Sequence, residues 1–383
     1  FVGAANVLVA MLWWTLHLAG LRWPPLALPT GEVPPGWLHA VVMQYQVLAA
    51  FVFGFLLTVF PRWMGLPELP RRAYVPVGVG LFGGQLVTLL GALGWPSAVQ
   101  VGAWMTLAGW LGAMAALLPL LWREQGTTWH ARACFGALVF GVVGVACWVA
   151  YVGGGSPRLA FAAIKLGTFG FLVPMYLTVA HRMFPFFAQN VAPGYVAWRP
   201  LWLLGVAWVL MVLHLALEMA HAYAWLWLAD LPLLALTLVM LWRWWPRGAA
   251  PMLLRALFIG FAWLPIAVAL YLVQSALFAL SGAFLLGRAP AHALFVGFFG
   301  SVLVAMVTRV TQGHSGRALV MPPVARYVFV AVQVTAVVRV AAELVPDGPL
   351  WQAVAGLAWL AALVPWLARI GHVVTTPRVD GKA

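Results

Sequence analysis

The sequence predicts an all-α, polytopic integral membrane protein with about twelve transmembrane helices in one bundle. The first observation is composition, because 64% of the 383 residues are hydrophobic and only 8% are charged. Soluble domains do not have such a composition, whereas membrane proteins do. The second observation is that apolar stretches of about twenty residues, the length that spans a bilayer, recur along the chain. The connections between them are short, so we predict one transmembrane domain over residues 1–383.

The apolar stretches place the helices in order along the chain. Proline and glycine clusters such as Pro24-Pro25 and Pro322-Pro323 fall between the stretches, where breaks in helical structure belong. The predicted helices cover residues 2–21, 37–60, 74–94, 98–121, 132–152, 159–181, 201–220, 225–243, 253–278, 289–310, 324–344 and 350–370.

The formal net charge of +13 has a topological explanation in such a chain. Most of the arginines fall in loops that follow even-numbered helices and in the C-terminal tail. Cytoplasmic loops are enriched in Lys and Arg, so this distribution predicts that both termini lie in the cytoplasm. The predicted partner of the surface is the lipid bilayer, and no nucleic acid is expected.

With this topology, five of the nine histidines share the outer half of the membrane, on four different helices. Ionisable groups at membrane depth are costly and tend to mark functional sites. The shared depth therefore indicates a candidate site that involves the set His17, His39, His214, His221 and His292.

His39 and His292 are the best matched pair, since each lies two or three residues inside an outward-facing helix start. Imidazole is a natural axial ligand for haem iron, and alanines beside both residues leave room for a flat macrocycle. We predict a bis-histidine haem b, with Arg288 one turn before His292 to pair with a propionate and Met43 lining the pocket. The alternative is that each is an interfacial histidine with its polar tip in water.

A second candidate group follows the pattern H-x-x-x-E-x-x-H, formed by His214, Glu218 and His221. At helical spacing the three side chains would share one face. The pattern is compatible with a second metal such as copper or with a proton-handling cluster. A helix end whose polar side chains face water is the simpler alternative.

At the inner side, two polar motifs end apolar helices. His181 begins the motif HRMFPFF at the end of the sixth helix, and residues 308–317, TRVTQGHSGR, end the tenth. Arg309, His314 and Arg317 in the second motif are candidates to bind an anion or a lipid headgroup, or to act as a topological anchor. Gly313 and Gly316 fit a turn after a helix C-terminus.

These motifs carry a family resemblance. TRVTQGHSGR, the preceding AHALFVGFFGSVLVAM, HAVVMQYQVLAAFVFGFLLTVFPRWMG at the second helix and HRMFPFF resemble the NnrS family, haem- and copper-containing membrane proteins of the bacterial nitric-oxide response. The family commonly has H-A-H-E-M at the second helix, where this chain has HAVVM from His39 to Met43. The resemblance therefore implies a divergent member that keeps a haem while the copper or proton function of the lost pair is in doubt.

The chain also has a more distant likeness to the catalytic subunits of haem-copper oxidases and nitric-oxide reductases. Those subunits have twelve helices and hold a low-spin haem on the second and tenth, the helices that carry His39 and His292 here. Their adjacent histidine pair and His-x-x-x-Tyr have no counterpart in this sequence. The likeness therefore does not imply an oxygen-reducing centre.

The function these observations predict is nitric-oxide handling or respiratory electron transfer in the bacterial cytoplasmic membrane. The expected partners are quinol, a periplasmic cytochrome or other subunits of a respiratory complex. Whether the chain is itself an enzyme stays open. The alternatives are a twelve-helix secondary transporter and a cofactor-free structural subunit of such a complex.

Overall fold

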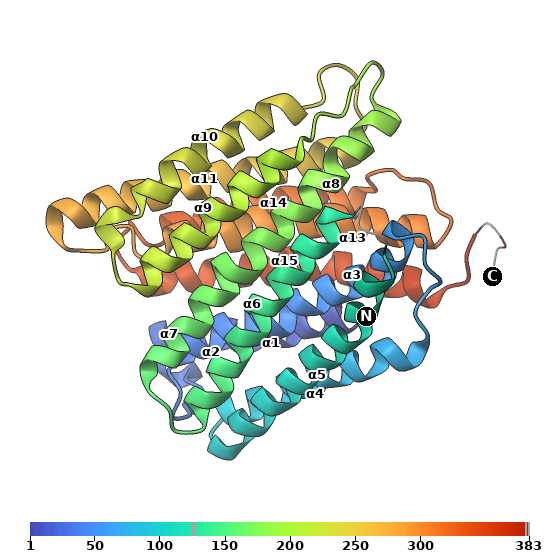
Figure 1. Ribbon diagram of the computed structural model, residues 1–383. Helices are drawn as coiled ribbons and strands as arrows, with labels where there is room; N and C mark the ends of the chain where they lie inside the picture. The colour runs from blue at the N-terminus through green and yellow to red at the C-terminus, as the bar shows by residue number, and fades with distance from the viewer. Residues whose placement is uncertain (125–127, 380, 382–383) are drawn as a thin grey trace. The chain divides into compact units, whose positions relative to one another are not determined.

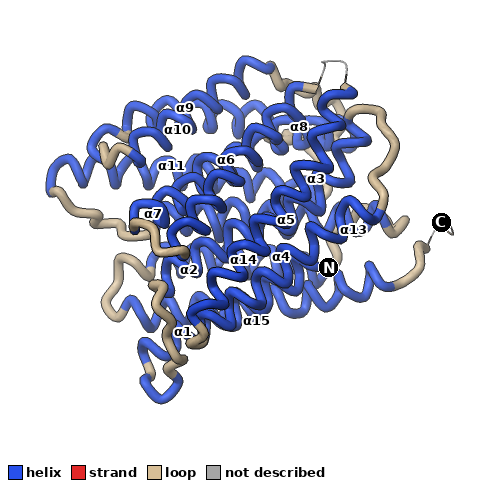
Figure 2. The backbone as a smooth tube through the Cα atoms, turned by 60° about the horizontal axis from the view of Figure 1, so that its bottom comes forward, coloured by secondary structure: helices blue, strands red, loops and turns tan. Residues whose placement is uncertain are grey.

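The predicted fold class is confirmed by a computed structural model, which describes residues 1–124, 128–379 and 381. The regular elements of the described part are all helices, and twelve of them are long and apolar enough to cross a membrane. Figures 1 and 2 show these helices running through the molecule, with loops confined to their ends. The protein is therefore a polytopic all-α membrane protein. The side of the membrane on which the termini lie stays a prediction.

Eight of the twelve spans are single helices, and six α-helices of the described part have Pro at their first or second position. Pro is favoured there because its missing N–H is one that a helix start leaves unpaired. The single-helix spans are α1 (Val2–Arg22), α4 (Arg71–Ala92), α5 (Pro96–Arg123), α6 (Trp129–Val152), α9 (Leu201–Met219), α11 (Met252–Ser281), α14 (Pro323–Ala341) and α15 (Gly348–Thr375). A short 3₁₀ turn, η1 (Pro24–Leu26), follows α1, and another, η4 (Tyr223–Trp225), precedes α10 (Trp227–Trp244) in the eighth span.

The other three spans each contain a π-helical segment, which the sequence analysis did not anticipate. They are also the most buried spans, with 67%, 78% and 72% of their most apolar windows buried inside the protein. π-Helical turns are rare and are frequent at functional sites. The three spans are α2 (Pro35–Val41), η2 (Val42–Leu48) and α3 (Ala49–Trp63); α7 (Pro157–Lys165), η3 (Leu166–Leu172) and α8 (Val173–Val191); and α12 (Ala289–His292), η5 (Ala293–Gly300) and α13 (Ser301–His314).

Three predicted helix ends are wrong, and one of them is the end of the twelfth span, which reaches Thr375 instead of residue 370. The sixth span does not end at residue 181 but continues through Pro185 to Val191. Its last turns are held by packing, because Phe184 is fully buried with its ring edge-on to Phe258 and Phe261 at 5.7 and 6.1 Å. Tertiary packing thus outweighs the helix-breaking tendency of proline.

The tenth span also runs further than predicted. It ends at His314, so Gly313 is helical rather than part of a turn. Gly316 does occupy the turn, with φ of +70°, the left-handed conformation that glycine adopts without steric cost.

The contacts group the chain into two compact units, which we describe separately. The first comprises Phe1–His17 and Pro25–Val179, and the second comprises Leu18–Pro24 and Ala180–Ala383. Helices α1 and α8 contribute residues to both. The organisation as a single domain stays a prediction.

In the first unit, α4 and α5 lie side by side and approach closely through glycines. A Cβ atom on Gly80 would lie 2.6 Å from the Cα atom of Gly109, so no side chain fits between the two backbones. Small residues at such crossings allow membrane helices to gain close van der Waals packing. The two π-helical segments η2 and η3 also contact each other in this unit.

In the second unit, α9 and α10 lie side by side and α11 packs against α10. The connection between α9 and α10 is the short segment that contains η4. Helix α11 also contacts η5 and α13, and α14 packs on α15. This arrangement brings the ends of α9, α10 and α11 together around polar side chains.

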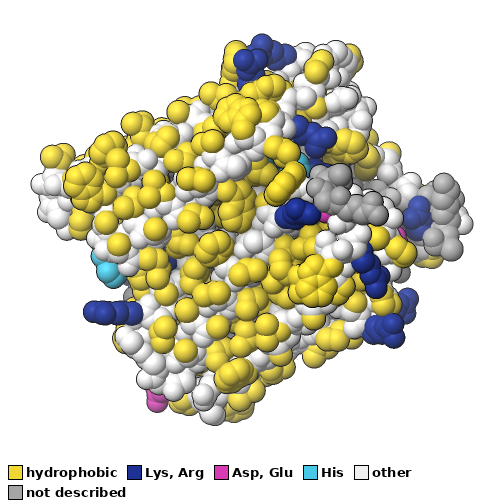
Figure 3. All heavy atoms as spheres, viewed as in Figure 1, with side chains coloured by type: hydrophobic (Ala, Val, Ile, Leu, Met, Phe, Trp, Pro, Cys, Tyr) yellow, Lys and Arg dark blue, Asp and Glu magenta, His cyan; other side chains and the backbone are white. Residues whose placement is uncertain are grey.

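The surface agrees with a lipid environment. Figure 3 shows hydrophobic side chains spread widely over the face in view, with Lys and Arg in a few separate groups. Large apolar side chains are exposed on several predicted transmembrane helices, for example Val79, Trp104, Trp202 and Val209. Apolar side chains on helix exteriors are stable when hydrocarbon rather than water surrounds them.

Candidate functional site

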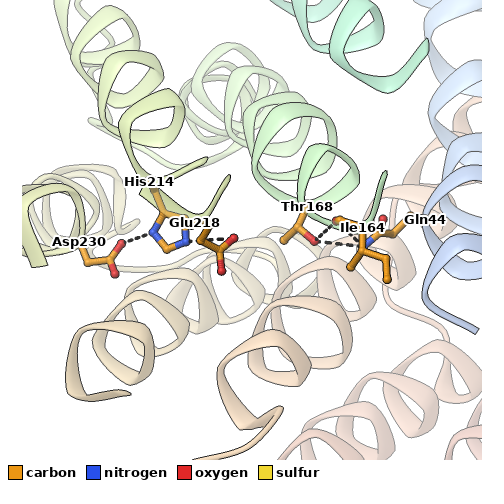
Figure 4. A network of polar contacts seen from close by, with 6 residues as sticks. All are labelled: Gln44, Ile164, Thr168, His214, Glu218 and Asp230. Atoms are coloured by element: carbon orange, nitrogen blue, oxygen red, sulfur yellow. Dashed lines mark hydrogen bonds and ion pairs between the residues drawn. The ribbon is translucent and has the colours of Figure 1, made fainter. Parts of the chain in front are cut away.

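A buried acid–base cluster lies in the second unit and consists of His214 and Glu218 on α9 and Asp230 on α10. His214 Nδ1 is 2.6 Å from Asp230 Oδ1, and His214 Nε2 is 3.6 Å from Glu218 Oε2. Figure 4 shows the imidazole between the two carboxylates. The three side chains are 0%, 3% and 1% exposed, respectively. Such a group inside a membrane-spanning region is unusual, because ionisable side chains there are costly unless they are paired.

The backbone explains how the cluster forms. His214 and Glu218 are four residues apart on one helix and so share a face. The chain then reverses through η4, and Asp230 enters in the first turn of α10, where a carboxylate interacts favourably with the helix dipole. Helix α11 closes the cluster with Tyr271, whose ring meets the His214 ring edge-on at 5.2 Å. Ser275 Oγ on the same helix donates to the carbonyl oxygen of Tyr223 at 2.8 Å.

His221 is not part of this face, so the predicted three-residue face is wrong at that position. Helix α9 ends at Met219, and His221 has φ of +54° in the turn that follows. Its side chain is exposed, and its Nδ1 atom is 2.8 Å from the hydroxyl of Tyr223. The helical spacing of H-x-x-x-E-x-x-H therefore breaks down after Glu218.

The geometry of the cluster does not favour the predicted second metal. Both ring nitrogens of His214 face carboxylates, so neither is directed toward an open coordination position. Among the described residues, no group of three or more His, Cys, Asp or Glu side chains is arranged to hold a metal ion. The arrangement is suited instead to proton exchange between an imidazole and two carboxyl groups.

His39, the first predicted haem ligand, belongs to α2 in the first unit. Its imidazole stacks on the indole of Trp14 with ring centroids 4.0 Å apart and planes 8° from parallel. The ring of His17 also stacks on Trp14, with ring centroids 5.2 Å apart. His39 is half-buried and its Nδ1 atom is inaccessible to solvent. The stacking fixes the plane of the imidazole, which is what an axial ligand needs.

His292, the second predicted ligand, ends α12 in the second unit. Its Nδ1 atom is 2.9 Å from the backbone carbonyl oxygen of Arg288, and a carbonyl can only accept, so Nδ1 carries the hydrogen. The neighbouring Ala289 and Ala293 are fully buried. Histidines that bind metals typically donate one ring N–H to a backbone carbonyl in this way, which leaves Nε2 as the basic nitrogen.

The predicted supporting residues have the following surroundings. Arg288 is exposed at the N-terminus of α12, and its backbone N–H donates to Glu343 Oε2 at 3.2 Å. Glu343 in turn pairs with Arg339, with 2.6 Å between Nη1 and Oε1. Met43 lies in η2 and is half-buried. The assignment of His39, His292, Arg288 and Met43 to one haem stays a prediction, since each is defined within its own unit.

The first unit contains a buried polar network that the pattern of apolar stretches does not predict. Gln44 in η2 donates from Nε2 to Thr168 Oγ1 at 3.0 Å and to the carbonyl of Ile164 at 3.2 Å, as Figure 4 shows. The Tyr45 hydroxyl donates to the carbonyl of Ala163 at 2.6 Å. These bonds join η2 to η3 at Thr168 and to the end of α7 at Ala163 and Ile164. The sequence feature that indicates this network is the polar motif MQYQ, residues 43–46, within an apolar stretch.

The network continues to α1, α4 and α5. Gln46 Nε2 donates to the hydroxyls of Thr88 and Thr106 at 3.1 and 2.9 Å. Asn6 Nδ2 donates to the carbonyl of Gln46 at 2.8 Å, and Gln85 Nε2 donates to the carbonyl of Asn6 at 2.7 Å. Buried polar groups of this kind specify one packing arrangement because each must find its partner.

The residues predicted to lie at the inner side each contact other parts of the protein. His181 is fully buried, with Nε2 3.2 Å from the carbonyl oxygen of Pro200. The Arg309 guanidinium lies over the ring of Phe187 at 4.0 Å. Arg317 donates to Thr376 Oγ1 at 3.1 Å, and the carbonyl of His314 accepts from Arg378 at 3.1 Å. Binding of an anion or lipid headgroup at Arg309, His314, Arg317 and His181 stays a prediction.

Comparison with known proteins agrees with the motifs. Comparison with curated proteins finds no match to the chain. The family described as NnrS protein matches residues 1–378, which is nearly the whole sequence. The match includes both π-interrupted spans that carry His39 and His292 and the span that carries His181. The chain therefore belongs to the NnrS family.

Proposed function

We propose that this chain is a haem-containing membrane protein that handles nitric oxide or passes electrons in a respiratory chain. Membership of the NnrS family supports a membrane protein of the haem-linked nitric-oxide response at the level of the family. The proposed haem is of the b type, with His39 and His292 as its two axial ligands. The observation that carries the proposal is the hydrogen bond of His292 Nδ1 to the carbonyl of Arg288 at 2.9 Å.

That bond makes His292 suitable for iron. With its hydrogen on Nδ1, the imidazole presents Nε2 as the electron-pair donor, and the bond prevents rotation of the ring. Fully buried Ala289 and Ala293 flank it with little bulk. The donor set and its hydrogen bonding thus fit a haem ligand.

The surroundings of His39 also fit a ligand. The Trp14 indole covers one face of the imidazole at 4.0 Å and restrains its orientation. Neutral imidazole suits haem iron in either oxidation state. When bound, the haem supplies one-electron redox chemistry and affinity for nitric oxide. The chain supplies ring orientation, a low-dielectric environment and, at Arg288, a positive charge one helical turn from His292.

Copper is not part of the proposal. Where the family commonly has His and Glu in its H-A-H-E-M motif, this chain has Val41 and Val42, which are buried and apolar. The cluster at His214 directs its ring nitrogens to carboxylates. We therefore propose a haem protein without the second metal.

Location and partners follow from the family and from polarity. We propose the bacterial cytoplasmic membrane, with quinol, a periplasmic cytochrome or other respiratory subunits as electron partners. Nitric oxide is small and apolar, so it partitions into lipid and reaches a membrane-embedded haem from the bilayer.

The test is the absorption spectrum of the purified protein, oxidised and reduced. We expect a Soret band and sharp reduced α-bands in the wild type. Both are lost in His39→Ala and in His292→Ala and retained in His314→Ala, because His314 is exposed at the end of α13 and outside the proposed ligand set. Elution as a single symmetric peak shows that each variant is folded. A folded wild-type protein without colour would contradict the proposal and favour a secondary transporter or a structural subunit.

A further inference from the structure

We propose that His214, Glu218 and Asp230 form a proton-binding site inside the membrane region, in which Glu218 carries the bound proton. The ligand of this site is a proton, and its route of entry is the turn between α9 and α10. The inference goes beyond the proposed function and does not depend on haem, since it rests on contacts within the second unit alone.

The first step is the charge of the cluster. The two carboxylates face one base, His214, from its two ring nitrogens. If both carboxyl groups were ionised, the cluster would be negative even with His214 protonated. All three side chains are at most 3% exposed, and an uncompensated buried charge costs several kcal/mol. The neutral cluster therefore holds two protons among its three groups.

The second step assigns those protons. Asp230 Oδ1 lies 2.6 Å from His214 Nδ1, the distance of a short charge-assisted hydrogen bond between imidazolium and carboxylate. Glu218 Oε2 lies 3.6 Å from Nε2, beyond normal hydrogen-bond length. Asp230 is therefore the ionised partner of protonated His214, and the second proton belongs to Glu218.

The helix dipoles give the same assignment. Asp230 is in the first turn of α10, where the positive end of the dipole stabilises a negative charge. Glu218 is the penultimate residue of α9, where the negative end of the helix dipole disfavours a negative charge. The start of α10 therefore favours an ionised Asp230, whereas the end of α9 favours a protonated Glu218.

The third step is the route of the proton. The backbone N–H of His221 donates to the carbonyl of Glu218 at 3.0 Å, which folds the turn back over the end of α9. The exposed His221 side chain has its Nδ1 atom 2.8 Å from the Tyr223 hydroxyl, and both residues lie in the turn that follows Glu218 and the end of α9. Tyr271 of α11 is a further titratable side chain that faces the cluster, with its ring edge-on to His214 at 5.2 Å.

The proposed transfer through this turn is balanced. Protonated His221 gives its Nδ1 proton to the Tyr223 oxygen while the Tyr223 hydroxyl proton passes to the Glu218 carboxylate. His221 ends neutral, Tyr223 keeps one proton, and Glu218 ends as a carboxylic acid. The hydrogen bond from Ser275 Oγ to the Tyr223 carbonyl, at 2.8 Å, holds the relay residue in place.

Infrared spectroscopy of the full chain in lipid tests the site. We expect a carbonyl stretching band of a buried carboxylic acid that shifts in D₂O. The band should shift when the protein is made with ¹³C-labelled glutamate and stay in place with ¹³C-labelled aspartate, and this comparison requires no variant. It should be lost in Glu218→Gln and retained in Glu343→Gln, the matched control, because Glu343 is paired with Arg339 at 2.6 Å.

The relay is tested by the rate at which that band shifts after transfer to D₂O. Tyr223→Phe removes the hydroxyl and keeps the ring, so exchange should slow several-fold while the band itself remains. The site proposal is overturned if the wild type has no exchangeable carboxylic acid band, if labelled aspartate moves the band, or if the band survives Glu218→Gln. Unchanged exchange in Tyr223→Phe overturns the relay.

Discussion

His214 is the residue on which the buried cluster depends, because it is the base that two carboxyl groups share. Its contact with Asp230 is short and fully buried, whereas the pair formed by Arg22 and Asp347 at 2.9 Å is roughly two-fifths exposed. Removing one partner of a buried pair leaves the other charge without compensation. An exposed pair is replaced by water at little cost. The two aspartates should therefore respond very differently to the same substitution.

Asp230→Asn is predicted to lower the free energy of unfolding by about 3–5 kcal/mol, the usual cost of breaking a buried ion pair. Asp347→Asn is the matched control and should cost at most about 1 kcal/mol, because its pair is screened by water. Asn also preserves the cap that Asp347 provides to the backbone N–H of Leu350. Thermal unfolding in detergent measures both variants. Equal losses of stability would show that Asp230 and His214 are not a buried charged pair.

The residue-level prediction from sequence was partly right for a physical reason. His214 and Glu218 lie on one helix, so their spacing alone predicts that they share a face. Asp230 was missed because it joins them from the next helix, after a reversal of the chain. Its signal was present, since an acidic residue inside an apolar stretch indicates a functional group. His221 was wrongly included because no local feature of the sequence shows that α9 ends at Met219.

At the scale of elements, the closest packing in the first unit is that of α4 on α5. The crossing depends on Gly80 and Gly109, whose backbones leave no room for a side chain. By contrast, nothing lies within 4 Å of the position that a Cβ atom on Gly112 of α5 would occupy. Comparing substitutions at Gly80 and Gly112 therefore separates the effect of packing from the effect of helix propensity.

Gly80→Ala is predicted to force α4 and α5 apart and to lower the free energy of unfolding by about 1–3 kcal/mol, the usual cost of overpacking. Gly112→Ala should stay within about 0.5 kcal/mol of the wild type, because its new methyl group meets no neighbour. Midpoints of thermal unfolding, measured side by side in the same detergent, compare them. A Gly80→Ala protein as stable as Gly112→Ala would mean that the two backbones are not in contact.

The existence of the helices was predictable, but their interruptions were not. Hydropathy reports where about twenty apolar residues occur, and this is sufficient to find each span. A π-helical turn such as η2 or η5 depends on tertiary contacts and has no distinct composition. The extension of α8 past Pro185 likewise depends on the packing of Phe184 against α11. Helix type and helix ends are therefore set by neighbours that are distant in sequence.

At the scale of the whole molecule, loop contacts within the second unit agree with the predicted alternation of sides. Arg22 after the first span pairs with Asp347 after the eleventh, and Arg288 after the ninth bonds Glu343 after the eleventh. Arg317 and Arg378 join the end of the tenth span to the C-terminal tail. Each contact joins two segments that the predicted topology places on the same side of the membrane. The arginine distribution then predicts which side is cytoplasmic.

A C-terminal fusion tests this orientation. A fluorescent protein that matures only in the cytoplasm should fluoresce at the C-terminus, and alkaline phosphatase, which needs the periplasm, should be inactive there. The same reporters fused after residue 345, in the loop that contains Asp347, should behave in the opposite way. Active phosphatase at the C-terminus would invert the predicted topology and would put His39 and His292 near the cytoplasmic face.

The central claim is that His39 and His292 are the axial ligands of one haem. Electron paramagnetic resonance of the oxidised, purified protein tests it most directly, because two imidazole ligands give a characteristic low-spin ferric signal. The account predicts that signal in the wild type and in His314→Ala, and its loss or conversion to high spin in both His39→Ala and His292→Ala. A low-spin signal that survives either ligand substitution would contradict the account.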